Sequence, residues 1–145
     1  MKKRYLLALT ALLLLVSLAF GGILSGCKTS DGDGTGIFEK ISVAEAYSFI
    51  QDNMTNPDFV ILDVRTAEEF NSGHIEGAVN IDFYASDFES QLDMLNKDKV
   101  YLVYCRSDNR SGQAVDRMED LGFIEAYDMS GGINAWNDAG YPTVQ

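Results

Sequence analysis

Short apolar runs alternate with amphipathic stretches along residues 37–145, which is the pattern of an α/β domain. Runs rich in β-branched and aromatic residues predict strands at 37–41, 59–62, 78–81, 100–104 and 124–128. The run VYLVY at 100–104 has no polar alternation, as expected of a strand covered on both faces. We therefore predict a mainly parallel sheet with right-handed crossovers, although the pattern does not give the strand order.

Helices are predicted between these strands because apolar residues recur at steps of three and four. The buried stripes comprise residues 43, 46, 47 and 50; 88, 92 and 95; and 114, 115, 118 and 121. A serine or threonine stands three residues before a glutamate at 42/45, 66/69 and 86/89, and each pair predicts a capping box. Gly131 and Gly132 lead into a last short helix with Trp136, which Gly140 and Pro142 end.

The N-terminal segment has the pattern of an export signal. Three basic residues precede an uncharged, leucine-rich run at 6–24, followed by Leu-Ser-Gly-Cys. This ending resembles the lipobox of bacterial lipoproteins, which implies that Cys27 is lipidated and becomes the first mature residue. An uncleaved signal anchor is the alternative. We expect a signal peptide at 1–26, the lipidated cysteine with a flexible linker at 27–36, and a domain at 37–145 on the extracytoplasmic face of the cell membrane.

The charge balance excludes several classes of partner. The chain has 11 basic and 22 acidic residues, a net charge of −11, and removal of 1–26 would take away three basic residues and no acidic one. So acidic a surface repels nucleic acid and anionic lipid headgroups, which leaves the lipid as the membrane attachment. The acidic residues are scattered, and we expect no metal site.

Cys105 is the main candidate for chemistry. It follows the strand at 100–104, where an open parallel sheet binds ligands, and six residues, 105–110, are expected between that strand and the next helix. If Cys27 is lipidated, Cys105 is a lone thiol in an exported protein. The helix N-terminus, Arg106 and Arg110 are expected to lower its pKa, and the arginines with the loop amides would hold an oxyanion. An inert buried cysteine is the alternative.

Four segments together resemble the single-domain rhodaneses, a sulfurtransferase family. They are CRSDNRS at 105–111, ILDVRTAEEF at 61–70, GHIEGAVNI at 73–81 and GGINAWNDAGYPTV at 131–144. The resemblance implies a five-stranded parallel sheet with helices on both faces. It also implies transfer of sulfur from thiosulfate or a persulfide to a thiol or cyanide, through a persulfide on Cys105 and without a cofactor. The substrate would bind at Arg106, Ser107, Asp108, Asn109, Arg110 and Ser111.

Two features separate this chain from relatives of that family. Only four residues stand between Cys105 and Arg110, whereas the cysteine phosphatases have five, so a phosphatase is disfavoured. There is no Cys-x-x-Cys motif, which disfavours a dithiol oxidoreductase.

Asp63 and Arg65 would support the site or form a structural ion pair. His74 is expected to be a hydrogen-bonded structural residue.

Asp108 departs from the family pattern, which commonly has glycine at this position. Aspartate tolerates a positive φ better than most residues, so the loop can keep its conformation. Its charge would oppose a thiolate and an anionic donor. We therefore hypothesise that thiosulfate is a poor donor and that a neutral or cationic persulfide, or a protein partner, supplies sulfur. The alternatives are a non-catalytic or redox-sensing binding module and a persulfide carrier for a protein acceptor.

Overall fold

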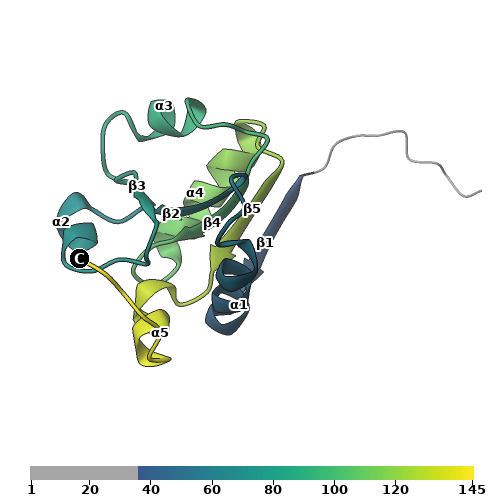
Figure 1. The fold of residues 1–145 in the computed structure, drawn as a ribbon. Helices are drawn as coiled ribbons and strands as arrows, with labels where there is room; N and C mark the ends of the chain where they lie inside the picture. Colours follow the sequence, from purple (N-terminus) through teal and green to yellow (C-terminus); the bar gives the residue numbers. More distant parts are fainter. Residues whose placement is uncertain (1–35) are drawn as a thin grey trace, which may run out of the picture. The chain divides into compact units, whose positions relative to one another are not determined.

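Strands and helices alternate along residues 36–145, the part of the chain that this computed structural model describes (Figure 1). The strands are β1 (Ile37–Ile41), β2 (Phe59–Asp63), β3 (Val79–Asn80), β4 (Val100–Tyr104) and β5 (Glu125–Met129). The helices are α1 (Val43–Asn53), α2 (Ala67–Asn71), α3 (Phe88–Asp93), α4 (Asn109–Asp120) and α5 (Gly132–Asp138). The predicted order and type of elements are confirmed.

The five strands form one parallel sheet in the order β1-β5-β4-β2-β3. The central strand β4 pairs with β5 on one side and β2 on the other, and Asp63 lies opposite Tyr104. The predicted α/β class with a parallel five-stranded sheet is confirmed. The strand order comes from the structure alone.

Two apolar cores lie on the two faces of the sheet. One contains side chains of α3 and α4, including Leu92 and Met118, and the other contains side chains of α1 and α5, including Trp136. Successive residues of β4 point to opposite faces, so Val103 belongs to the first core and Tyr104 to the second. The expectation that helices cover both faces is confirmed.

Two of the three predicted capping boxes are present, those of Ser42 with Glu45 and of Thr66 with Glu69. The third prediction, Ser86 with Glu89, is wrong. Helix α3 begins after Asp87, whose side chain makes no cap hydrogen bond. Ser86 lies instead within a turn that is closed by a hydrogen bond of 3.1 Å from the Phe88 amide to the Ala85 carbonyl.

The predicted signal peptide, the lipidation of Cys27 and most of the linker fall outside the described residues. Within 36–145, every helix is too short or too polar to cross a membrane.

Candidate active site

Cys105 directly follows the carboxyl end of the central strand β4, and three further residues separate it from helix α4. The predicted six-residue connection is wrong: α4 begins at Asn109, so residues 105–108 form the loop and Arg110 lies in the first turn of the helix. Asp108 is the helix N-cap and has a φ of 77°, the only positive φ of a non-glycine residue in the described part of the chain. This left-handed conformation is the reason that glycine suits the position.

The thiol of Cys105 is surrounded by hydrogen-bond donors. The residue is 1% exposed, and the Ser111 hydroxyl donates to Sγ at 3.5 Å. Burial raises the pKa of the thiol, but hydrogen bonds from Ser111 and from the amides of Ser107 and Arg110 outweigh it, so the pKa of Cys105 lies below its ordinary value. The site therefore stabilises the thiolate relative to that of an ordinary cysteine.

Hydrogen bonds, rather than the two arginines, are the main cause that lowers this pKa. The Arg110 guanidinium makes two hydrogen bonds to the Glu69 carboxylate, at 2.7 and 2.8 Å, and lies over the Tyr84 ring. The pair lowers the pKa of Glu69 to about 2 and raises that of Arg110. In this structure Arg110 is thus held by a carboxylate, while Arg106 is exposed.

Asp108 has a cationic partner that the sequence analysis did not identify. Its carboxylate lies 3.3 Å from Lys40 Nζ on β1 and accepts a hydrogen bond from the Gly131 amide at 3.4 Å. The same ammonium group lies 3.3 Å from the Asp128 carboxylate. Lys40 and Asp128 are cross-strand neighbours in β1 and β5, and only the strand pairing reveals this. The negative charge of Asp108 is therefore partly balanced.

Backbone hydrogen bonds join the start of α5 to the loop at 105–108. The Ile133 amide donates to the Cys105 carbonyl at 2.9 Å, and the Asn134 amide donates to the Arg106 carbonyl at 3.2 Å. Gly132 has a φ of 57°, and a Cβ atom there would collide with the backbone of Cys105 and Arg106. Glycine is required at this position because two backbone segments meet there.

The remaining predicted residues have structural contacts. Asp63 and Arg65 form a buried ion pair at 2.6 Å, and Arg65 also donates to the Gly73 carbonyl at 2.7 Å. His74 Nδ1 lies 3.1 Å from the Phe70 carbonyl, and the two rings stack. These contacts agree with the structural alternative for all three residues. The Asn109 side chain lies 3.2 Å from the Gln113 amide.

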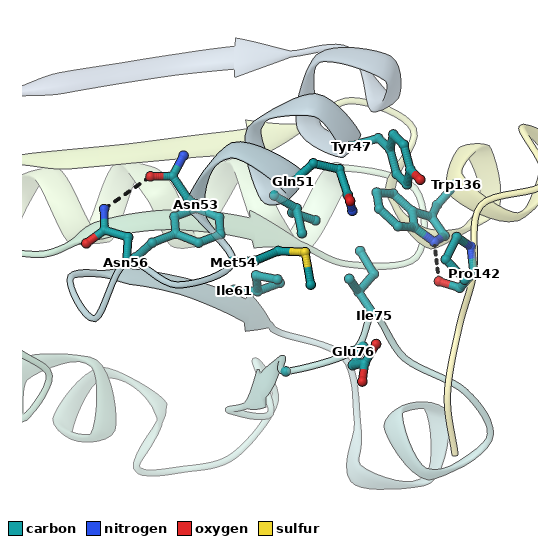
Figure 2. Close-up of a pocket in the computed structure, with 13 residues that line it drawn as sticks. Tyr47, Gln51, Asn53, Met54, Asn56, Ile61, Ile75, Glu76, Trp136 and Pro142 are labelled. Carbon is teal, nitrogen blue, oxygen red and sulfur yellow. Dashed lines mark hydrogen bonds between the residues drawn. The ribbon is translucent and has the colours of Figure 1, made fainter.

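A cavity of about 300 Å³ lies on the other face of the sheet. Figure 2 shows Tyr47 and Trp136 at one end of it and the hydrogen-bonded Asn53 and Asn56 at the other. The lining residues are Tyr47, Ile50, Gln51, Asn53, Met54, Asn56, Phe59, Ile61, Ile75, Glu76, Gly77, Trp136 and Pro142. None belongs to the loop of Cys105, so this cavity is separate from the thiol.

Comparison with known proteins identifies the family. Residues 46–139 match the model of the rhodanese-like domain, and the chain therefore belongs to that family. A relative named thiosulfate sulfurtransferase GlpE, from Pseudomonas savastanoi pv. phaseolicola, is 37% identical over 89 residues, which cover 59% of this chain and 80% of that protein. A protein of the same name from Shewanella oneidensis is 35% identical over 80 residues, 54% of this chain and 76% of that protein.

Solved structures agree with this assignment. The crystal structure of a rhodanese-related protein from Thermoplasma volcanium is 33% identical, with a TM-score of 0.61, and the match covers 73% of this chain and 97% of that one. In three other curated relatives, the matched segment spans only about half of the protein, from 47% to 59% of its length. The predicted rhodanese-like fold is confirmed.

Proposed function

We propose that this protein is a sulfurtransferase that carries a sulfane sulfur as a persulfide on Cys105. The observation that supports this most strongly is the buried thiol with a lowered pKa, held at the end of the central strand by the Ser111 hydroxyl and the loop amides. Membership of the rhodanese-like family and relatives named thiosulfate sulfurtransferase also support it.

The reaction would proceed in two displacements. In the first, the Cys105 thiolate attacks the outer sulfur of the donor; a new S–S bond forms, and the donor's sulfur bond breaks with its electron pair on the leaving group. In the second, an acceptor thiolate or cyanide attacks the outer sulfur, and Cys105 leaves as a thiolate. The amides of Ser107 and Arg110 would stabilise that thiolate in both steps.

The charges around the thiol favour a donor that is not a small anion. Arg110, one of the two arginines expected to bind an anion, is paired with Glu69. Asp108 places a carboxylate in the loop, balanced only by the half-exposed Lys40. An unbalanced carboxylate about 5 Å from a thiolate would oppose its charge by roughly 3 kcal/mol at an effective dielectric near 20. We propose a neutral or cationic persulfide, or a protein partner, as the donor.

Intact mass spectrometry tests the sulfur-transfer step. The protein and its Cys105→Ala variant are incubated with thiosulfate and, separately, with glutathione persulfide. A gain of one sulfur that cyanide removes, and that is absent from the variant, is the expected result. If a folded protein with a free thiol gains no sulfur from either donor, the proposal is wrong. A persulfide that forms but turns over slowly would instead favour a carrier for a protein acceptor.

The donor preference is tested at Asp108 and Lys40. Replacement Asp108→Gly removes the carboxylate and suits the positive φ, so thiosulfate turnover should rise roughly tenfold, less than the unbalanced charge would give. Replacement Lys40→Met leaves the carboxylate unbalanced and should lower thiosulfate turnover. Unchanged turnover in Asp108→Gly would show that this charge does not select the donor.

We also propose that the protein is attached to a membrane by a lipid on Cys27, because three basic residues and an uncharged, leucine-rich run precede Leu-Ser-Gly-Cys in the sequence. Cells grown with a clickable palmitate analogue should label the protein, and Cys27→Ala should abolish both the label and membrane association. A Cys27→Ala protein that stays in the membrane would favour the uncleaved anchor.

A further inference from the structure

The cavity beside α1 and α5 has no part in the chemistry of Cys105, and its size suits a small organic molecule. Its volume is about 300 Å³. Ligand-binding pockets in proteins span roughly 300–1,000 Å³. Its walls come from α1, β2, the segment at 75–77 and α5 (Figure 2). Protein interiors are otherwise close-packed, so a space of this volume is larger than an ordinary packing defect.

The inner wall of the cavity is apolar. Ile50 of α1, Ile61 of β2 and Ile75 line it, and each of these side chains is at most 8% exposed. The Trp136 indole N–H donates to the Pro142 carbonyl at 3.0 Å, so the ring offers an occupant only its apolar surface. A molecule seated here removes apolar surface from water and gains dispersion contacts. The occupant therefore needs an apolar body.

The polar groups that line the cavity differ in whether they are already engaged. Asn53 and Asn56 are hydrogen-bonded to each other at 3.1 Å. Gln51 and Glu76 are exposed, and neither side chain has a hydrogen-bond partner within residues 36–145. In the view of Figure 2 the Gln51 amide lies above Ile75 and the Glu76 carboxylate lies below it. These two groups are therefore available to an occupant.

The charge at the cavity is negative. Among the described residues that line it, Glu76 is the only charged one, and the ion pairs of residues 36–145 involve other carboxylates. The Ala78 amide donates to the Ile75 carbonyl at 3.0 Å, and this turn holds the backbone of Glu76 at the cavity. A carboxylate only accepts hydrogen bonds, and the net charge of −11 also favours cations. An occupant with a positive hydrogen-bond donor fits this site better than an anion.

We propose that this cavity binds a small organic ammonium compound with an apolar body. The body lies against Ile61 and Ile75, and the ammonium group donates to the Glu76 carboxylate, with the Gln51 carbonyl as a second acceptor. Such charge-assisted hydrogen bonds are stronger than neutral ones, so a neutral analogue of the same shape binds more weakly. The lining residues are separate from the loop at 105–108, so this binding is independent of the proposed sulfur transfer.

Titration with benzylamine, an ammonium ion at pH 7, tests the proposal by NMR. Trp136 is the only tryptophan of the chain, so its indole N–H gives a single signal. We expect a saturable shift of that signal, with a dissociation constant of about 1 mM or lower. The ring protons should show intermolecular NOEs to the methyl groups of Ile61 and Ile75. Benzyl alcohol should bind about fivefold more weakly, and benzoate should give no shift.

Two glutamate variants test the role of the carboxylate. Glu76→Gln should weaken benzylamine binding about fivefold and leave benzyl alcohol binding unchanged. Glu119→Gln is the matched control, because it removes an exposed carboxylate from α4, on the opposite face of the sheet, and it should change neither affinity. If Glu76→Gln disturbs the turn, the natural protein is titrated at about 20 and about 500 mM NaCl. The higher salt should weaken binding of benzylamine and not of benzyl alcohol.

The absence of a saturable shift, or of NOEs to the two isoleucines, overturns the assignment of a site. Benzyl alcohol that binds as tightly as benzylamine, or an affinity for benzylamine that neither Glu76→Gln nor salt lowers, overturns the ligand class. None of these readouts requires a persulfide, so failure of the sulfurtransferase proposal is recognised separately.

Discussion

The ion pair between Glu69 and Arg110 joins α2 to α4 beside Cys105, and its contribution to stability can be worked out. The Arg110 guanidinium, together with smaller effects of the Thr66 cap, lowers the pKa of Glu69 from 4.5 to about 2. A shift of this size corresponds to about 3 kcal/mol of stability if it is fully realised. The Glu69 side chain is 30% exposed, and solvent screening reduces this to about 1–2 kcal/mol.

The sign of the pH dependence follows from the lowered pKa. The stabilisation is fully present above pH 4.5, the ordinary pKa of a glutamate, and is lost as the pH falls through about 2. Replacement Glu69→Gln removes the charge but keeps a side chain that can complete the capping box with Thr66. We expect it to cost about 1–2 kcal/mol at pH 7 and less than half of that near pH 2.5.

Urea unfolding measures this difference, with fluorescence of the single, buried Trp136 as the signal. The control is Glu68→Gln, which removes an equal charge from an exposed position in the first turn of the same helix. If Glu69→Gln and Glu68→Gln have the same free energy of unfolding at pH 7, the ion pair does not stabilise the fold. A deficit that stays constant as the pH falls would contradict the linkage to Glu69.

Three further substitutions test the packing around the site. Asp63→Asn leaves Arg65 buried without its anion, and the free energy of unfolding in urea should fall by about 3–5 kcal/mol. Gly132→Ala places a Cβ atom against the backbone of Cys105, so iodoacetamide alkylation at pH 6 should slow. The free energy of unfolding should fall by about 1–3 kcal/mol, seen as a lower melting temperature. An alkylation rate equal to that of the natural protein would contradict the close approach. Leu92→Ala removes a fully buried side chain of α3, and the free energy of unfolding measured by calorimetry should fall by about 2–5 kcal/mol. The rate of Cys105 alkylation per folded molecule should not change.

Local patterns in the sequence determined much of the fold. The spacing of apolar residues, together with the cap and glycine signals at helix ends, predicted the strands and helices within a few residues, because both depend on local backbone geometry. The capping boxes of α1 and α2 were predicted because both partners lie within one turn. The prediction failed at Ser86, which lies within the turn that the Phe88 amide and the Ala85 carbonyl close, so that α3 begins only at Phe88. The position of Cys105 at a strand end was also readable from the local pattern.

The electrostatics of the site were decided by tertiary structure. Glu69 is 41 residues from Arg110, and Lys40 is 68 residues from Asp108. Neither pairing leaves a periodic signal in the sequence, because a charged residue on a strand or helix end has the same local pattern whichever partner it meets. The strand order brings β1 beside β5 and so places Lys40 against Asp128. The sequence by itself determined the order of strands and helices and placed Cys105 in a loop at a strand end, whereas the tertiary structure decided where that loop ends and which charges surround the thiol.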